Sequence, residues 1–96
     1  MRVIPKYFDV LGHTIEVVMR DDLMEVDDCD GRFVAARNQI ELQSDMVPSV
    51  EMATFWHECM HVIATHMGMK DLNEDEEKID KLGQGVAQIL KTKRSK

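Results

Sequence analysis

Hydrophobic residues are arranged differently in the two halves of the chain. The first half holds short apolar runs with partial alternation and many β-branched residues, which is typical of strands. These runs cover residues 14–19, 33–35 and 39–42. Gly12 and Gly31 interrupt the pattern as turn residues, and the last two runs can pair across residues 36–38.

The second half shows helical periodicity instead. Residues 49–67 contain neither Gly nor Pro, and they are preceded by Pro48 and followed by Gly68. Four apolar residues recur there at helical spacing and predict a buried stripe: Trp56, Met60, Ile63 and Met67. We therefore predict a first long helix over about residues 49–67.

A second helix is predicted over about residues 74–91. Asn73 is the expected N-cap, and Glu76 three residues later completes the form of a capping box. The expected buried face consists of Ile79, Leu82, Val86, Ile89 and Leu90. Strands in the strand-rich part, residues 1–45, followed by helices indicate an α+β fold, with an approximately three-stranded sheet packed on two C-terminal helices.

Composition narrows the class of protein further. With 96 residues the chain predicts a single domain over residues 1–96, and its thin core makes stabilisation by a bound metal plausible on physical grounds. The net charge of −6 argues against nucleic acid as a partner. We expect no membrane span and no signal peptide. Two cysteines, Cys29 and Cys59, are too few for a disulfide scaffold, so we expect a cytoplasmic protein.

The segment from His57 to His61 has the form H-E-x-x-H. On a helix, residues four apart lie about 40° apart round the axis, so both imidazoles can reach one metal ion. Zinc binds neutral imidazole, and a catalytic zinc site has three protein ligands and an open position for water. Glu58 lies about 100° from His57 and is placed to accept a proton from that water as general base. The motif predicts one zinc ion and a peptidase.

Two histidines hold zinc weakly, so a third donor is required. His66 falls on the opposite side of the helix from His57, and His13 is remote in sequence. The acidic residues that open the second helix remain as candidates. We favour Glu76, whose side chain is long enough to reach across from a packed helix, and Asp75 and Glu77 stay open as alternatives. Acidic residues in a first helical turn also complement the helix dipole without any metal.

With strands leading into the motif and a Glu-rich second helix, the chain resembles the ImmA/IrrE-type metallopeptidases, especially the short versions common in phages and prophages. The resemblance covers about residues 14–90. It implies a minimal zincin in which His57, His61 and Glu76 bind zinc and Glu58 is the base. It also implies an edge strand that binds substrate backbone, for which residues 40–43 are our candidate.

Members of this family often act on a regulatory protein, so the resemblance implies a protein or peptide substrate of that kind. Tyr7 and His13 are the candidates for a group that stabilises the oxyanion. The alternative function is a non-catalytic protein-interaction module of phage origin that zinc stabilises. The oligomeric state does not follow from the sequence.

Overall fold

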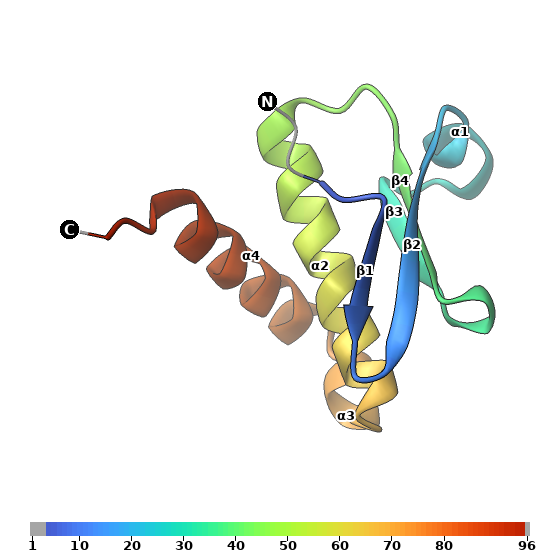
Figure 1. Cartoon of the computed structure of the whole chain (residues 1–96). Coiled ribbons are helices and arrows are strands. Elements are labelled where there is room, and N and C mark those ends of the chain that lie inside the picture. Colours follow the sequence, from blue (N-terminus) through green and yellow to red (C-terminus); the bar gives the residue numbers. More distant parts are fainter. Residues whose placement is uncertain (1–3, 96) are drawn as a thin grey trace.

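The computed structural model describes residues 4–95, which form a four-stranded mixed sheet and four α-helices (Figure 1). The strands are β1 (Tyr7–Val10), β2 (His13–Arg20), β3 (Gly31–Val34) and β4 (Gln39–Gln43). The α-helices are α1 (Leu23–Asp27), α2 (Pro48–His66), α3 (Lys70–Asn73) and α4 (Glu76–Thr92), and a 3-10 turn, η1, covers Ala35–Arg37. Helix α2 lies between the sheet and α4.

The α+β class is confirmed, with two differences in detail. The sheet has the order β1-β2-β4-β3, so it holds one strand more than expected. The extra strand β1 is short, and it pairs antiparallel with β2 across Leu11 and Gly12, which both adopt positive φ. The predicted hairpin is present as β3 and β4, while β2 pairs with β4 in parallel.

The prediction that residues 40–43 form a substrate-binding edge strand was wrong. Residues 40–43 belong to β4, which is paired with β2 on one side and β3 on the other. All of its hydrogen-bonding capacity therefore lies inside the sheet. The free edges of the sheet belong to β1 and β3, and β3 is the one that packs beside α2.

Helix α2 is apolar on two sides, and the sheet covers the side that the sequence pattern did not favour. Phe55, Cys59 and Val62 are buried against the sheet. The expected stripe is only half-buried at Trp56, Met60 and Ile63, and Met67 is exposed. Periodicity alone could not rank the two faces, because both recur at helical spacing. Cys59 is a buried apolar group, as predicted.

Helix α4 begins later than expected because Asp75, and not Asn73, is its N-cap. The Asp75 carboxylate accepts a hydrogen bond from the Lys78 backbone N–H at 3.1 Å. Asn73 instead ends the short helix α3, which the sequence pattern did not reveal. Within residues 4–95, no helix is long and apolar enough to span a membrane.

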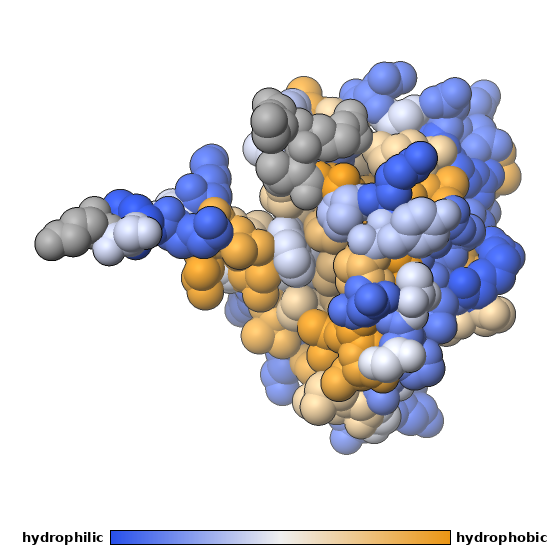
Figure 2. Space-filling model, viewed as in Figure 1, coloured by the Kyte–Doolittle hydropathy of each residue, from blue (hydrophilic) through white to orange (hydrophobic). Residues whose placement is uncertain are grey.

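The packing of α4 on α2 is close at one point and open beyond it. A Cβ added at Gly83 would lie 2.8 Å from the backbone N of His57, so only glycine permits this approach. Ile79 is fully buried there, but the predicted buried face is wrong further along the helix. Ile89 and Leu90 are 65% and 41% exposed because the C-terminal half of α4 points away from α2 (Figure 1), and Leu82, in the first half of the helix, is 47% exposed. Figure 2 shows hydrophobic side chains gathered over α4 where it leaves the body of the molecule.

The outer face of the sheet carries a buried charge network centred on Glu41. Its carboxylate contacts Arg32 at 2.6 Å, Arg20 at 3.1 Å and Arg37 at 3.6 Å, and only 4% of the residue is exposed. Burial opposes ionisation of this carboxyl, but the hydrogen bonds from Arg32 and Arg20 outweigh it and lower the pKa of Glu41. The network ties β2, β3 and β4 together on the face opposite α2.

Candidate metal centre

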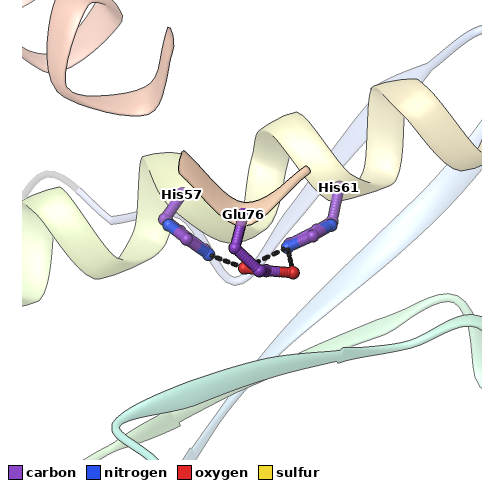
Figure 3. Close-up of side chains that lie close together, drawn as sticks. All are labelled: His57, His61 and Glu76. Atoms are coloured by element: carbon purple, nitrogen blue, oxygen red, sulfur yellow. Dashed lines mark hydrogen bonds and ion pairs between the residues drawn. The ribbon is translucent and has the colours of Figure 1, made fainter. Parts of the chain in front are cut away.

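Two histidines and one glutamate converge between α2 and α4. His57 and His61 lie one turn apart on α2, and Glu76 is the first residue of α4 (Figure 3). The Glu76 carboxylate lies 3.1 Å from His57 Nε2 and 3.1 Å from His61 Nε2. One ligand atom from each residue lies within 4.8 Å of the others, which is close enough to share one metal ion.

The other nitrogen of each imidazole is held by a second side chain. His57 Nδ1 lies 3.1 Å from a carboxylate oxygen of Asp80 on α4. His61 Nδ1 lies 2.6 Å from the side-chain oxygen of Asn73, whose amide donates to Thr65. In the tautomer with the proton on Nδ1, each ring donates to these oxygens and presents the lone pair of Nε2 towards Glu76.

This arrangement fits a metal ion on the chemistry of its donors. A neutral imidazole has one N–H, yet each of these rings faces an acceptor at both nitrogens. A cation between the two Nε2 atoms and the Glu76 carboxylate resolves this mismatch without a second proton on either ring. Two neutral imidazoles and one carboxylate are a set that zinc prefers, and the hydrogen bonds at Nδ1 are the usual orienting contacts of such ligands.

Glu58 lies beside the three candidate ligands and points towards the sheet. The residue is 7% exposed, and burial raises the pKa of its carboxyl. His57 and His61 oppose this shift, the nearby Glu76 carboxylate adds to it, and a backbone hydrogen bond from Phe33 in β3 opposes it. Glu58 is therefore a buried carboxyl between the histidines and the edge strand.

A groove runs between β3 and α2 past these residues. One cavity of about 430 Å³ is lined by β3, the motif histidines, Asn73 and Glu76. A smaller one of about 220 Å³ adjoins it and shares Gly31, His57 and Glu58. Strand β3 approaches α2 closely at this wall because Gly31 has no side chain, since a Cβ there would lie 2.7 Å from Thr54 Cγ2.

The predicted site residues can now be placed. His57, Glu58, His61 and Glu76 lie together, as the motif and the second helix suggested. The alternatives for the third ligand lie elsewhere: Asp75 caps α4, and Glu77 faces Lys81 at 3.5 Å.

The two candidates for an oxyanion-stabilising group also lie away from the groove. Tyr7 contacts Glu16 at 3.4 Å, and the ring of His13 stacks on that of His66 with centroids 3.8 Å apart. Neither residue lines either of the two cavities.

Two residues of the site were not predicted. Asp80 lies four residues after Glu76, so the two carboxylates share a face of α4, and this spacing was a usable signal. Asn73 was interpreted only as a helix cap. Its contact with His61 depends on the turn of α3, which has no clear sequence signature.

Comparisons of the chain with protein families, with curated proteins and with solved structures found no significant match.

Proposed function

We propose that this protein is a zinc-dependent metallopeptidase, a minimal zincin of the ImmA/IrrE type. The observation that carries the proposal is the convergence of His57, His61 and Glu76 beside the buried carboxyl of Glu58 in an open groove. Three protein ligands leave a coordination position free, which distinguishes a catalytic zinc site from a structural one with four.

His57, His61 and Glu76 would hold the ion, and Asp80 and Asn73 would orient the two imidazoles. When bound, zinc supplies a Lewis acid that lowers the pKa of water and polarises a carbonyl group. Glu58 accepts a proton from the attacking water and returns it to the leaving amine. Its buried position, which raises the pKa of its carboxyl, suits a group that must both take up and release a proton.

The backbone groups on the free edge of β3 favour a peptide as the substrate. In an antiparallel pair, alternate residues direct their backbone groups to the partner strand, and the Asp30 carbonyl already accepts from Gln43 N in β4. Gly31 and Phe33 therefore direct their backbone groups towards the free edge, beside Glu58. An extended peptide that adds to this edge would run along the groove and past the candidate ligands. A regulatory protein with an exposed extended segment could supply such a peptide.

The test is proteolysis by the zinc-loaded protein. We expect cleavage of an unfolded casein-type substrate by the wild type and a loss of at least about 100-fold in Glu58→Gln, because general-base catalysis contributes about 10² to 10⁴. The variant should still bind zinc, since Glu58 is not among the ligands. Glu25→Gln, at an exposed position of α1, is the control that should keep full activity.

Two outcomes would contradict the proposal. Cleavage that persists in Glu58→Gln would point to a contaminating protease. Zinc binding by the wild type with no cleavage of any unfolded or extended substrate would favour the alternative, a zinc-stabilised module that binds a partner protein.

A further inference from the structure

Two histidines outside the candidate metal centre stack on each other at the C-terminal end of α2. His66 is the last residue of α2, and His13 is the first residue of β2, directly after the turn between β1 and β2 (Figure 1). The two rings lie 18° from parallel, with their centroids 3.8 Å apart. This contact joins the start of β2 to the end of α2.

The side-chain amide of Asn38 connects the two rings. Its Oδ1 lies 2.8 Å from His66 Nε2, and its Nδ2 lies 3.5 Å from His13 Nδ1. In the arrangement that satisfies both contacts, His66 donates to the amide oxygen, and the amide nitrogen donates to the lone pair of a neutral His13. The backbone fixes Asn38 in this place, because it has a left-handed φ of 47° and its carbonyl accepts from Glu16 N at 3.1 Å.

This cluster accommodates one added proton but not two. A proton on His66 enters at Nδ1 and leaves the contact with Asn38 intact. A proton on His13 alone is accommodated if the amide turns over and its nitrogen donates to a lone pair on His66 Nε2. With both rings protonated, each ring presents an N–H to Asn38, whose oxygen faces only one of them, and two positive charges lie in stacked rings.

The surroundings of the two rings do not offset these charges. Within residues 4–95, no carboxylate forms a hydrogen bond or an ion pair with His13 or His66. Burial lowers the pKa of His66, and the nearby His13 lowers it further. The charged and titratable side chains of the surrounding segments are engaged elsewhere: Asp9 with Thr14, Glu16 with Tyr7 and Gln39, Arg32 and Arg37 with Glu41, and His61 with Asn73.

The cluster adjoins one end of the groove. The ring of Phe33 meets that of His66 edge-on, with centroids 6.2 Å apart, and Phe33 lines the larger cavity together with Ala35 and Thr65. Asn38 also donates its backbone N–H to the Ala35 carbonyl at 3.2 Å. A movement of the cluster would therefore reach this end of the groove.

We propose that His13, Asn38 and His66 form an acid-sensitive clasp, which holds the β1–β2 turn and η1 on the end of α2 and opens when both rings are protonated. Because folding lowers the pKa of His66, the stability that the clasp contributes is complete above about pH 6.5 and is lost as the pH falls through the folded value. The clasp requires neither a metal nor peptidase activity, so its failure and a failure of the proposed function are separate results.

Amide hydrogen exchange at pH 7.5 and pH 5, measured by NMR, tests the clasp. The amides of Glu16 and Asn38 are the reporters, since they donate to the carbonyls of Asn38 and Ala35. Their protection factors should fall at least about fivefold at pH 5, the factor that corresponds to two unit charges about 4 Å apart in water. The Gln43 amide, which donates to the Asp30 carbonyl at the other end of β4, is the control and should keep its protection.

Two substitutions assign the effect to the ring pair. His13→Phe and His66→Phe each keep a stacked ring and remove one charge, so the fall at Glu16 should disappear in both. Tyr7→Phe on β1 is the matched control and should behave like the wild type. Unchanged protection in the wild type, a fall that persists in both histidine variants, or an equal fall at Gln43 would overturn the proposal.

Discussion

The contact between α2 and α4 is tested most sharply by adding one methyl group at Gly83. In Gly83→Ala the new Cβ would lie 2.8 Å from the backbone N and 2.9 Å from the Cα of His57. These are backbone atoms of a long helix and cannot rotate away. Since favourable contact begins at about 3.5 Å, α4 must retreat by about 0.7 Å.

Gly85→Ala is the matched control on the same helix. A Cβ there meets no atom within 4 Å. Both substitutions gain about 1 kcal/mol from the better helix propensity of alanine. Only Gly83→Ala adds an overpacking cost of about 1–3 kcal/mol, so the two variants should differ in free energy of unfolding by that amount.

The displacement of α4 should also reach the candidate metal centre, because Glu76 and Asp80 both contact His57 at 3.1 Å from this helix. We expect zinc affinity to fall about tenfold in Gly83→Ala and to stay unchanged in Gly85→Ala. Chemical denaturation and competition with a zinc chelator measure the two effects. Equal stability of the two variants would refute the close crossing, and a destabilised Gly83→Ala with unchanged zinc affinity would refute a site shared between the helices.

Three further substitutions test other parts of the structure. Asp80→Ala should lower zinc affinity about 10- to 100-fold in chelator competition while the chain stays folded, because the variant loses the contact that orients His57 and, besides it, one exposed hydrogen bond from Gln84. Leu42→Ala removes a fully buried side chain and should cost about 2–5 kcal/mol in urea denaturation. Glu41→Gln should cost about 1–3 kcal/mol at neutral pH, because its arginine partners lose their charged acceptor. Since the pKa of Glu41 is lowered by folding, this difference should be full above about pH 4.3 and vanish as the pH falls through the folded value.

The parts of the site that depend on one helix were predictable, and those that depend on contacts between elements were less so. His57, Glu58 and His61 take their relative positions from helical geometry alone. Glu76 could be named as a candidate but not chosen by geometry, because its reach depends on how α4 crosses α2 at Gly83. Asn73 was interpreted only as a helix cap, because its contact with His61 joins two separate elements and cannot be predicted from local sequence.

The fold shows the same division. The β3–β4 hairpin was predictable because both strands and their turn are local in sequence. The parallel pairing of β2 with β4 is not local, so nothing in the pattern showed that residues 40–43 lie inside the sheet. The apolar face of α4 was predicted to be buried because of its periodicity, which records that a surface is hydrophobic but not which partner covers it.

Calorimetric titration of the metal-free protein with Zn²⁺ measures directly whether the two histidines and Glu76 form a zinc site. We predict one ion per chain, lost in His57→Ala and His61→Ala and much weakened in Glu76→Gln. Glu74→Gln is the matched control, since the side chains of Glu74 and Glu76 are 67% and 66% exposed, and it should bind zinc like the wild type. Absence of zinc binding by the wild type, or equal binding by Glu76→Gln and Glu74→Gln, would contradict the account.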